Sequence, residues 1–594
     1  MMPDTRGLSA VRKWGQRAPW WLVLLLGVAC AVLGAVIVLQ PFTSLSVLRL
    51  FIVIVLAVSG VADLASACRS RSARWTVAVG VLWLVTALVA AVFPGLTLRV
   101  LALVVGLALV AGGMARLVGA VRGRGDERAA HVLGALASVV FGCLALAWPD
   151  VTLLVVAVVF GARTFVFGCA RIVEAVRAAH EGGRRENEGV GGGRGWLHGW
   201  PRTAAMAASL VVALALLALS AALHRASPSP TAFYTRPASV PATAGALLRS
   251  EPFTRAVPAS AQAWKILYTT TRDDGVPAVA SGIVLVSRSA PAGPRPVIAW
   301  AHGTTGVASS CAPSLLQKPF EAGALPALDQ IVANGWVLVA TDYTGLGTAG
   351  PHPYLVGQGE ARSVLDAVRA ARHLATVHLS DQTAVWGHSQ GGHAALWTGQ
   401  LQPTYASDVP LAGVAALAPA SDLTGLVSNL NTVPGGSIFA SYIVTAYSQT
   451  YPDVSFNRLI RPEAQAQVRG HASRCLAEPE VFVSVVSSLL ADKPIFATDP
   501  ATGASGARLR ENTPTGQIQA PLLIAQGEND ALVLPAVQQG FVQQACKRGD
   551  TIDYRTFPGR DHVGVVAPDS ALIPLLVTWT QDRFAGKPAP DTCS

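Results

Sequence analysis

The stretch Thr383-Ala384-Val385-Trp386-Gly387-His388-Ser389-Gln390-Gly391-Gly392 decides the fold of the C-terminal half of this chain. Its first four residues indicate a short buried strand, and the small residues after Gly391 indicate the start of a helix. A serine between such a strand and such a helix, flanked by glycines, is typical of a Gly-x-Ser-x-Gly nucleophile elbow. The bare pattern is common in a glycine-rich chain, so the prediction depends on what surrounds it.

Short β-branched runs alternate with helical stretches on both sides of this segment. The runs Ile266–Thr271 and Gly282–Ser287 are expected to form leading antiparallel strands. Six later runs are expected to form buried parallel strands: Val297–His302, Val337–Asp342, Ala384–Gly387, Val414–Leu417, Leu522–Gln526 and Ile552–Phe557. This alternation predicts a parallel sheet covered by helices, with its functional residues at the carboxyl ends of the strands.

One connection is much longer than the sheet requires. The residues between Leu417 and Leu522 are far more than one helix and two loops need. We expect the excess, about residues 421–513, to form a helical cap over the catalytic end of the sheet. Its aromatic residues should form the core of the cap, and some should line a substrate pocket: Phe439, Tyr442, Tyr447, Tyr451, Phe456, Phe482 and Phe496.

A nucleophilic serine needs an adjacent base, and the base needs an orienting carboxylate. After a nucleophile elbow of this kind the chain order is serine, acid, histidine. His562 is the only histidine beyond the predicted cap and follows the last predicted strand, so it is the candidate base. Asp530 follows a strand and a glycine-containing loop and is the candidate acid, with Glu528 and Asp561 as alternatives.

The carbonyl oxygen of a substrate needs preorganised hydrogen-bond donors. One is expected to be the backbone N–H of Gln390, at the start of the predicted helix. The second is expected from the loop His302-Gly303-Thr304-Thr305-Gly306, with Thr304 as the candidate and Thr305 as the alternative. Three histidines are expected to have structural roles: His302 beside this loop, and His388 and His393 beside the serine.

Several spaced motifs of this half occur in order, and together they resemble the secretory lipase family of the yeast lipase A type. The residues that carry the resemblance are Ala301–Gly306, Thr341–Gly347, His352–Leu355, Glu360–Arg372, Gly387–Gly392, Asp530 and His562. The resemblance covers about residues 233–584. It implies an α/β-hydrolase with a cap and a Ser-Asp-His triad that acts on acylglycerols or related esters. The sequence contains no motif for a metal or an organic cofactor, and none is expected.

The first 225 residues hold most of the apolar surplus of a chain that is 51% hydrophobic and 13% charged. Seven apolar stretches are long enough to span a bilayer: about residues 20–40, 46–67, 75–93, 97–119, 130–148, 152–174 and 203–223. A cleavable signal peptide is the alternative for the first stretch, but that stretch is long and lacks a small-residue cleavage site. We therefore predict a membrane bundle of about seven helices.

The first six stretches contain a repeat. Pro41, Pro94 and Pro149 recur at intervals of 53 and 55 residues. Each is followed by a short turn and by a second apolar stretch that leads into arginines. This layout predicts three tandem helical hairpins. It resembles the small HdeD-like family of bacterial acid-resistance membrane proteins over about residues 15–180.

Charge predicts the orientation of the spans. Basic residues lie before the first span and after the even-numbered ones, which places the N-terminus in the cytoplasm and everything after about Arg225 outside. Residues 1–225 hold 21 Lys and Arg against 9 Asp and Glu, whereas residues 226–594 hold 24 against 26. The formal charge of +10 is thus a topology signal, and no nucleic-acid partner is expected.

The cysteines follow the same division. Four lie in or beside the predicted spans and are expected to act as small apolar residues: Cys30, Cys68, Cys143 and Cys169. Four more lie in the predicted exported half, where an oxidising compartment favours two disulfides that can pair in three ways. We favour Cys311–Cys475 and Cys546–Cys593, because each pair can tie a mobile segment to the body.

The expected domain order begins with a six-helix membrane domain over residues 1–180. A cytoplasmic loop and the seventh span follow over 181–225, and then a tether rich in Pro, Ser, Ala and Thr over 226–260. The α/β-hydrolase domain with its cap occupies residues 261–594.

Three functional hypotheses are open. The first is an outward-facing serine ester hydrolase (lipase or carboxylesterase) of the cell membrane, in which Ser389 attacks the acyl carbon, His562 moves the proton and Asp530 orients the imidazole. The second transfers the acyl group to an envelope lipid or sugar. The third makes the membrane half a sensor or channel, with Asp63 and Arg163 as candidate intramembrane charges, although Asp63 is expected at the cytoplasmic interface. A lipid or ester substrate is the expected partner.

Overall fold

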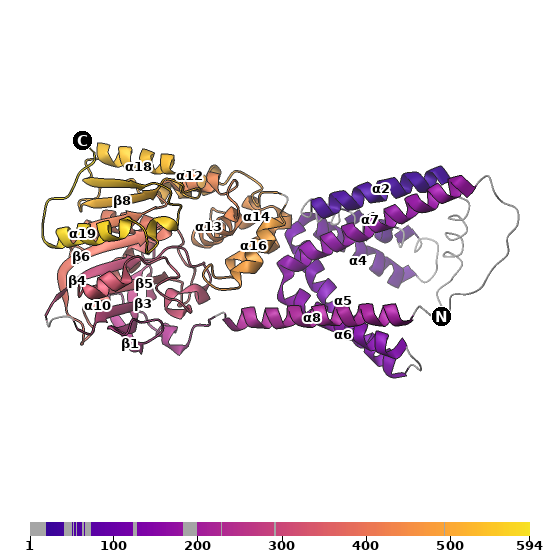
Figure 1. The fold of residues 1–594 in the computed structure, drawn as a ribbon. Coiled ribbons are helices and arrows are strands. Elements are labelled where there is room, and N and C mark those ends of the chain that lie inside the picture. Colours follow the sequence, from indigo (N-terminus) through magenta and orange to yellow (C-terminus); the bar gives the residue numbers. More distant parts are fainter. Residues whose placement is uncertain are drawn as a thin grey trace. The chain divides into compact units, whose positions relative to one another are not determined.

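The computed structural model describes residues 20–40, 50, 53–54, 56–61, 64–65, 73–122, 127–181, 199–226, 228–289, 293–491 and 493–593. The chain divides near Ala222 into two compact units, which differ in architecture (Figure 1). Asp63, Cys68 and the basic residues before the first predicted span lie outside the described residues.

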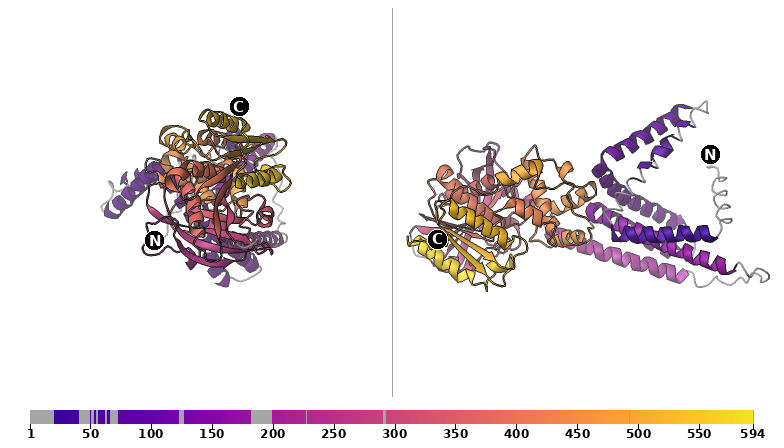
Figure 2. Two further views of the ribbon diagram at one scale, coloured as in Figure 1. Left: turned by 90° about the vertical axis from the view of Figure 1, so that its left-hand side faces the viewer. Right: turned by 90° about the horizontal axis from the view of Figure 1, so that it is seen from above.

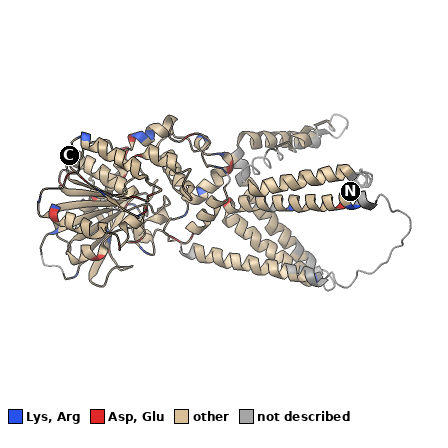
Figure 3. Cartoon of the chain, turned by 45° about the horizontal axis from the view of Figure 1, so that its top comes forward, with Lys and Arg blue, Asp and Glu red and all other residues tan. Residues whose placement is uncertain are grey.

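The first unit is helical. Its elements are α2 (Trp20–Leu39), α4 (Ala73–Val92), α5 (Pro94–Arg122), α6 (Glu127–Ala147) and α7 (Pro149–Glu181), followed by α8 (Gly199–Ala226). Pro94 and Pro149 are the first residues of α5 and α7, where a missing N–H costs no helical hydrogen bond. Figure 3 shows that these helices carry few charges among the described residues.

Within this unit, glycines bring pairs of helices into backbone contact. Gly34 of α2 lies against Gly161 and Phe165 of α7, and a Cβ at Gly34 would overlap the backbone of Phe165. Gly106 of α5 lies against Gly142 of α6 in the same way, and Gly60 against Gly80 of α4. Each pair joins helices of two different predicted repeats. The second span of the first repeat contacts the first span of the second repeat, and the second and third repeats are joined in the same way. The second span of the third repeat contacts the first span of the first repeat. Small residues allow this close approach between apolar helices.

Two helices in the described part of the chain have the length and hydropathy to cross a membrane, Trp21–Leu39 and Met206–Leu223. Shorter apolar helical stretches cover Gly80–Val92, Val100–Ala115 and His131–Ala147. Six of the seven predicted stretches are therefore helical, and the stretch 46–67 lies partly outside the described residues. Seven membrane crossings stay a prediction.

The second unit is built on a nine-stranded sheet in the order β1-β2-β3-β5-β4-β6-β7-β8-β9. The strands are β1 (Leu247–Phe253), β2 (Ala261–Thr271), β3 (Pro277–Ser287), β4 (Arg295–Ala301), β5 (Val337–Thr344), β6 (Leu379–His388), β7 (Leu411–Leu417), β8 (Leu522–Gly527) and β9 (Ile552–Phe557). The first three are antiparallel, and β3 pairs antiparallel with β5. All pairings from β5 through β9 are parallel, as predicted.

Helices cover both faces of this sheet (Figures 1 and 2). The core on one face includes residues of α10 (Gly357–Ala371), α11 (Gln390–Tyr405) and α18 (Pro535–Lys547). The core on the other face includes residues of α9 (Leu328–Ala333) and α19 (Leu572–Phe584). Because both faces are buried, the central parts of the parallel strands are apolar, for example Val337–Ala340 of β5 and Leu522–Ala525 of β8.

The predicted cap is present between β7 and β8. Its helices are α12 (Leu423–Asn429), α13 (Gly436–Thr450), α14 (Phe456–Leu459), α15 (Gln465–Ala472), α16 (Val481–Leu489) and α17 (Gly503–Glu511). Tyr442 and Tyr447 are fully buried in the cap, whereas Phe482 is exposed.

The prediction of a tether over residues 226–260 is wrong for most of that range. Phe233 and Tyr234 are buried in a cluster with Leu267, and residues 247–253 form β1. Two buried aromatic side chains and the hydrogen bonds of an edge strand fix this segment to the sheet, although it is rich in Pro and Ser. The composition alone predicts neither feature.

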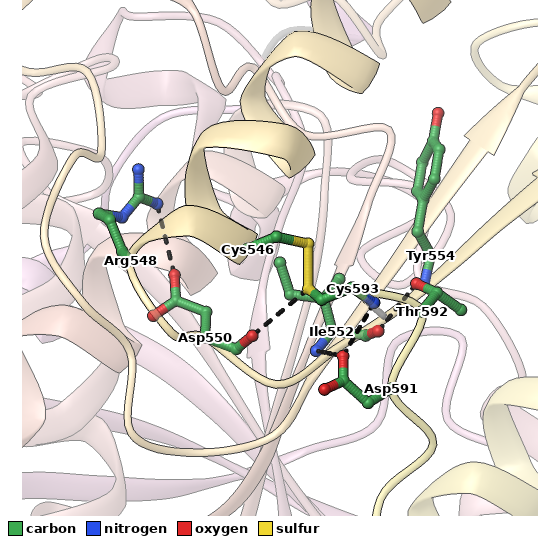
Figure 4. Close-up of a disulfide and its surroundings, with 8 residues drawn as sticks. All are labelled: Cys546, Arg548, Asp550, Ile552, Tyr554, Asp591, Thr592 and Cys593. Carbon is green, nitrogen blue, oxygen red and sulfur yellow. Dashed lines mark hydrogen bonds and ion pairs between the residues drawn. A yellow bond between two sulfur atoms is a disulfide. The ribbon is translucent and has the colours of Figure 1, made fainter.

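Both favoured disulfides are confirmed. Cys311 pairs with Cys475, which joins the loop after β4 to the cap, and Cys546 pairs with Cys593. The second disulfide ties the C-terminal segment to α18 (Figure 4). That segment also lies along the edge strand β9, where the Thr592 N–H donates to the Ile552 carbonyl and the Tyr554 N–H donates to Thr592 Oγ1. It thereby covers unpaired polar groups of a sheet edge.

Candidate active site

Ser389 lies on the turn between β6 and α11, with a backbone φ of 58° and ψ of −117°. This left-handed φ is costly for a residue with a side chain. Cβ atoms at Gly387 and Gly391 would overlap the Gly391 and Ala301 carbonyl oxygens, respectively. The glycines of the pattern are therefore a steric requirement of the turn, which projects the serine hydroxyl away from the sheet.

His562, on the loop after β9, reaches the serine across the end of the sheet. Its Nε2 lies 2.8 Å from Ser389 Oγ, and its Nδ1 lies 2.8 Å from Asp530 Oδ2. With Nδ1–H donating to the carboxylate, Nε2 accepts the serine proton. The structure thus brings together the three residues predicted as nucleophile, base and acid.

Asp530, on the loop after β8, is nearly fully buried. Its Oδ1 accepts the N–H groups of Leu532 and Val533, and its Oδ2 accepts from Gln526 Nε2. Burial acts to raise the pKa of Asp530, but the hydrogen bond and charge of His562 and these N–H donors outweigh it and hold the pKa below its usual range. The carboxylate is therefore ionised and fixed beside the imidazole.

The two alternative acids point elsewhere. Glu528 Oε1 accepts the Thr556 hydroxyl at 2.9 Å, and Asp561 Oδ1 accepts the Gly564 N–H at 2.6 Å. Neither carboxylate shares a hydrogen bond with His562 among the described residues.

The predicted oxyanion donors lie at the same cavity as the serine. Gln390 is the first residue of α11, so its N–H has no acceptor within the helix. The Thr304 side chain shares a hydrogen bond of 2.9 Å with the Tyr354 hydroxyl, and both residues line the cavity with Ser389. Thr305 is not among the residues that line this cavity, and its hydroxyl donates to the Cys311 carbonyl, so the lining favours Thr304 of the two candidates.

Two further histidines of the motifs, His302 and His388, form hydrogen bonds with backbone carbonyl groups next to the site. His302 Nδ1 lies 2.7 Å from the Gly303 carbonyl, and His388 Nε2 lies 2.8 Å from the carbonyl of His562. Burial is the main cause that lowers the pKa of His302 to about 4 and that of His388 to about 3. Both rings are neutral near pH 7, as structural hydrogen-bonding groups should be.

A buried carboxyl group that sequence reasoning missed supports the residue after the serine. Glu360 Oε1 accepts from Gln390 Nε2 at 2.7 Å and from the Leu355 N–H at 3.0 Å, and Oε2 lies 2.9 Å from His393 Nδ1. Leu355, at a positive φ of 56°, also lines the cavity. Glu360 precedes Val364 by one helical turn on the buried face of α10. A carboxyl on an apolar stripe was the signal that could have identified it.

The cavity at Ser389 is narrow and largely apolar. Leu426, Leu430, Phe439 and Ile443 of the cap line it, and its volume is about 10 Å³. That volume holds roughly one water molecule. An acyl chain can therefore enter only if the cap side chains or helices shift.

A serine, a histidine and an aspartate at the strand ends of such a sheet are typical of the serine hydrolases of the α/β-hydrolase fold. Residues 325–592 match the secretory lipase family, and residues 25–79, 78–145 and 133–190 each match the "short repeat of unknown function (DUF308)". The C-terminal unit is accordingly a lipase/esterase enzyme, and the three repeat matches agree with the three predicted hairpins.

Among similar proteins, the chain is 28% identical over 396 residues to the "Probable inactive lipase MT1628" of Mycobacterium tuberculosis, which covers 61% of this chain and 84% of the relative. It is 25% identical over 356 residues to the "Secreted triacylglycerol lipase LIP3" of Malassezia globosa, with 56% and 75% covered. The solved structure of Candida antarctica lipase A is similar in fold, with a TM-score of 0.53 at 21% identity over 62% of this chain and 89% of that chain.

Proposed function

We propose that the chain is a membrane-anchored, outward-facing serine ester hydrolase that cleaves acylglycerols or related lipid esters. The observation that carries the proposal is the continuous hydrogen-bonded path from Ser389 through His562 to Asp530 at an apolar cavity. A relative named as a secreted triacylglycerol lipase supports the substrate class.

In the proposed reaction, Ser389 Oγ attacks the acyl carbon as His562 Nε2 takes its proton. The N–H groups of Gln390 and Thr304 stabilise the negative charge on the carbonyl oxygen. The imidazolium returns its proton to the leaving alkoxide, and an acyl-enzyme remains. Water, deprotonated by His562, then releases the acid and regenerates the serine. Asp530 holds the imidazole tautomer throughout.

The helical half supplies the anchor in this proposal. Seven spans with a cytoplasmic N-terminus place the hydrolase on the outer side, as the distribution of basic residues favours. Two disulfides in the second unit and none among the described residues of the first support an oxidising location for the enzyme. The sensor or channel hypothesis gains little support, because Arg163 of α7 is exposed and an intramembrane relay residue faces a protein interior.

The test is a chain-length series of p-nitrophenyl esters and a triacylglycerol, given to the full chain in detergent micelles. We expect hydrolysis that Ser389→Ala abolishes. Ester turnover unchanged by Ser389→Ala would contradict the assignment.

Acyl transfer is a second candidate because the cap side chains that line the cavity are apolar, and such walls disfavour water beside an acyl-enzyme. Adding an alcohol or sugar acceptor to the same assay distinguishes the two activities. An ester product that exceeds free acid would favour transfer over hydrolysis.

A further inference from the structure

The cap helix α16 is inverted with respect to an ordinary surface helix. Its serines face inward, with Ser484 and Ser487 at 0% and 1% exposure, whereas Phe482 and Leu489 are 63% and 69% exposed. A surface helix normally buries its apolar face and shows water its polar face. The environment outside α16 is therefore expected to be apolar.

Hydrogen bonds hold the polar face inward. The Ser487 hydroxyl lies 2.7 Å from His471 Nε2, and Arg474 Nη1 donates to the Ser484 hydroxyl at 3.3 Å. Rotating the helix to hide its apolar face would break both of these buried hydrogen bonds, which is costly. The exposed apolar face is thus a fixed feature of the fold.

The exposed side chains form one uncharged stripe. Phe482, Val485, Leu489 and Leu490 are exposed and recur at helical spacing on one side. No Asp, Glu, Lys or Arg occurs from Val481 to Ala491. Clustered exposed apolar side chains of this kind mark an interaction surface, whereas single ones do not.

The chain itself indicates what covers this stripe. The apolar helix α8 ends at Ala226, and the enzyme body begins at the buried side chains of Phe233 and Tyr234. Arg249 Nη1 fixes this point by donating to the Phe233 carbonyl at 2.9 Å. Residues 227–232, extended, span at most about 22 Å. An enzyme anchored by α8 therefore stays close to the membrane surface.

The stripe is also connected to the active site. The Ser437 hydroxyl, at the start of α13, shares a hydrogen bond of 2.7 Å with the Ser488 hydroxyl of α16. Phe439 and Ile443, further along α13, line the cavity at Ser389. The apolar surface thus lies on the helix next to a wall of the substrate cavity.

We infer that the stripe of α16 docks into the outer leaflet of the membrane that anchors the chain, and that the ester cleaved at Ser389 is a lipid of that leaflet. This inference rests on the proposed function. Docking places the cap at the bilayer surface, so that a lipid reaches the cavity without crossing water.

The experiment uses the full chain in phosphatidylcholine and phosphatidylglycerol liposomes that contain a long-chain diacylglycerol. The variant Phe482→Gln/Leu489→Gln is compared with Val276→Gln, which changes an exposed apolar residue at the β2–β3 turn. We expect the first variant to hydrolyse the diacylglycerol at least about tenfold more slowly, because it loses two inserted apolar side chains. Hydrolysis of water-soluble p-nitrophenyl acetate should stay unchanged in both variants.

Insertion is measured directly with brominated lipids. The additional fluorescence of Phe482→Trp should be quenched, and that of Val276→Trp should not. Absent quenching, an unchanged diacylglycerol rate, or a wild-type dimer that the double variant dissociates would overturn the inference. If the wild-type chain cleaves neither substrate while Phe482→Trp is quenched, the proposed hydrolase activity fails and the docking surface stands.

Discussion

At the scale of single residues, Ser389, His562 and Asp530 form one hydrogen-bonded chain across the ends of three strands. His562 could be chosen because one histidine follows the cap, and Asp530 because it follows a strand end. Glu360 could not be assigned in this way, because its contacts with Gln390 and Leu355 depend on how α10 packs against α11. Helical spacing in a sequence predicts which face of a helix a residue lies on. It does not predict which atoms of a neighbouring helix that residue will contact.

The choice of Asp530 over its neighbours can be tested with isosteric amides. Asp530→Asn should lower kcat by about 10⁴-fold, because the amide favours the wrong imidazole tautomer. Asp561→Asn is the control, since its carboxylate accepts from Gly564, and it should keep kcat within about twofold. The measurement is steady-state hydrolysis of p-nitrophenyl butyrate. Equal losses in both variants would exclude Asp530 as the orienting acid.

Glu360 should act as a positioning residue for the oxyanion site. Glu360→Gln replaces an acceptor with an amide that cannot accept from Gln390 and His393 together, so kcat should fall roughly 10- to 100-fold with KM little changed. Asp366→Asn, on the same helix and bonded to Thr270 and Tyr405, is the matched control and should lower the melting temperature without lowering kcat. An unchanged kcat in Glu360→Gln would show a purely structural role.

His352 makes stability depend on pH. Burial is the main cause that lowers its pKa to about 3 from an ordinary 6.5, so the unfolded chain takes up this proton first. The stability associated with the neutral ring is complete above pH 6.5 and is lost as pH falls toward 3. Relative to His352→Asn, wild-type protein should lose up to about 1.4 kcal/mol per pH unit between pH 6 and 4. Parallel stability curves for the two proteins, measured by urea unfolding, would contradict this.

At the scale of elements, eight strands and the cap were predicted from the sequence, and β1 was missed. Its sequence Leu-Leu-Arg-Ser-Glu-Pro-Phe contains a proline and two charges, which a central strand does not tolerate and an edge strand does. The inversion of α16 could not be predicted either. Its serines face inward because they form hydrogen bonds with His471 and Arg474, which lie on other parts of the cap.

The disulfide at the C-terminal edge should stabilise the enzyme unit. Cys593→Ser breaks the bond to Cys546, which closes a loop of 47 residues, and should cost about 2–4 kcal/mol of unfolding free energy. Cys143→Ser, at an exposed free cysteine of α6, should leave the thermal unfolding of the enzyme unit unchanged. Identical melting temperatures for the three proteins under oxidising conditions would refute the contribution.

At the scale of the whole molecule, composition divided the chain correctly into a helical half and an α/β half. The repeat period predicted three hairpins, but the glycine contacts of Gly34, Gly106 and Gly60 reveal that the strong pairs lie between repeats. A repeat period in the sequence identifies the repeating hairpin and does not identify the helix against which it packs. The same glycines would suit a helix pair within one repeat or between two repeats. The number of crossings depends on a bilayer, so it stays part of the proposal.

The central claim is that an activated Ser389 faces the outside of the cell, and a membrane-impermeant fluorophosphonate tests it most directly. A serine activated by His562 attacks the phosphorus and displaces fluoride, leaving a phosphonylated side chain. On intact cells that express the full chain, we predict modification of Ser389 by mass spectrometry and none in Ser389→Ala. Modification that requires permeabilised cells would contradict the topology, and no modification in either condition would contradict the enzyme.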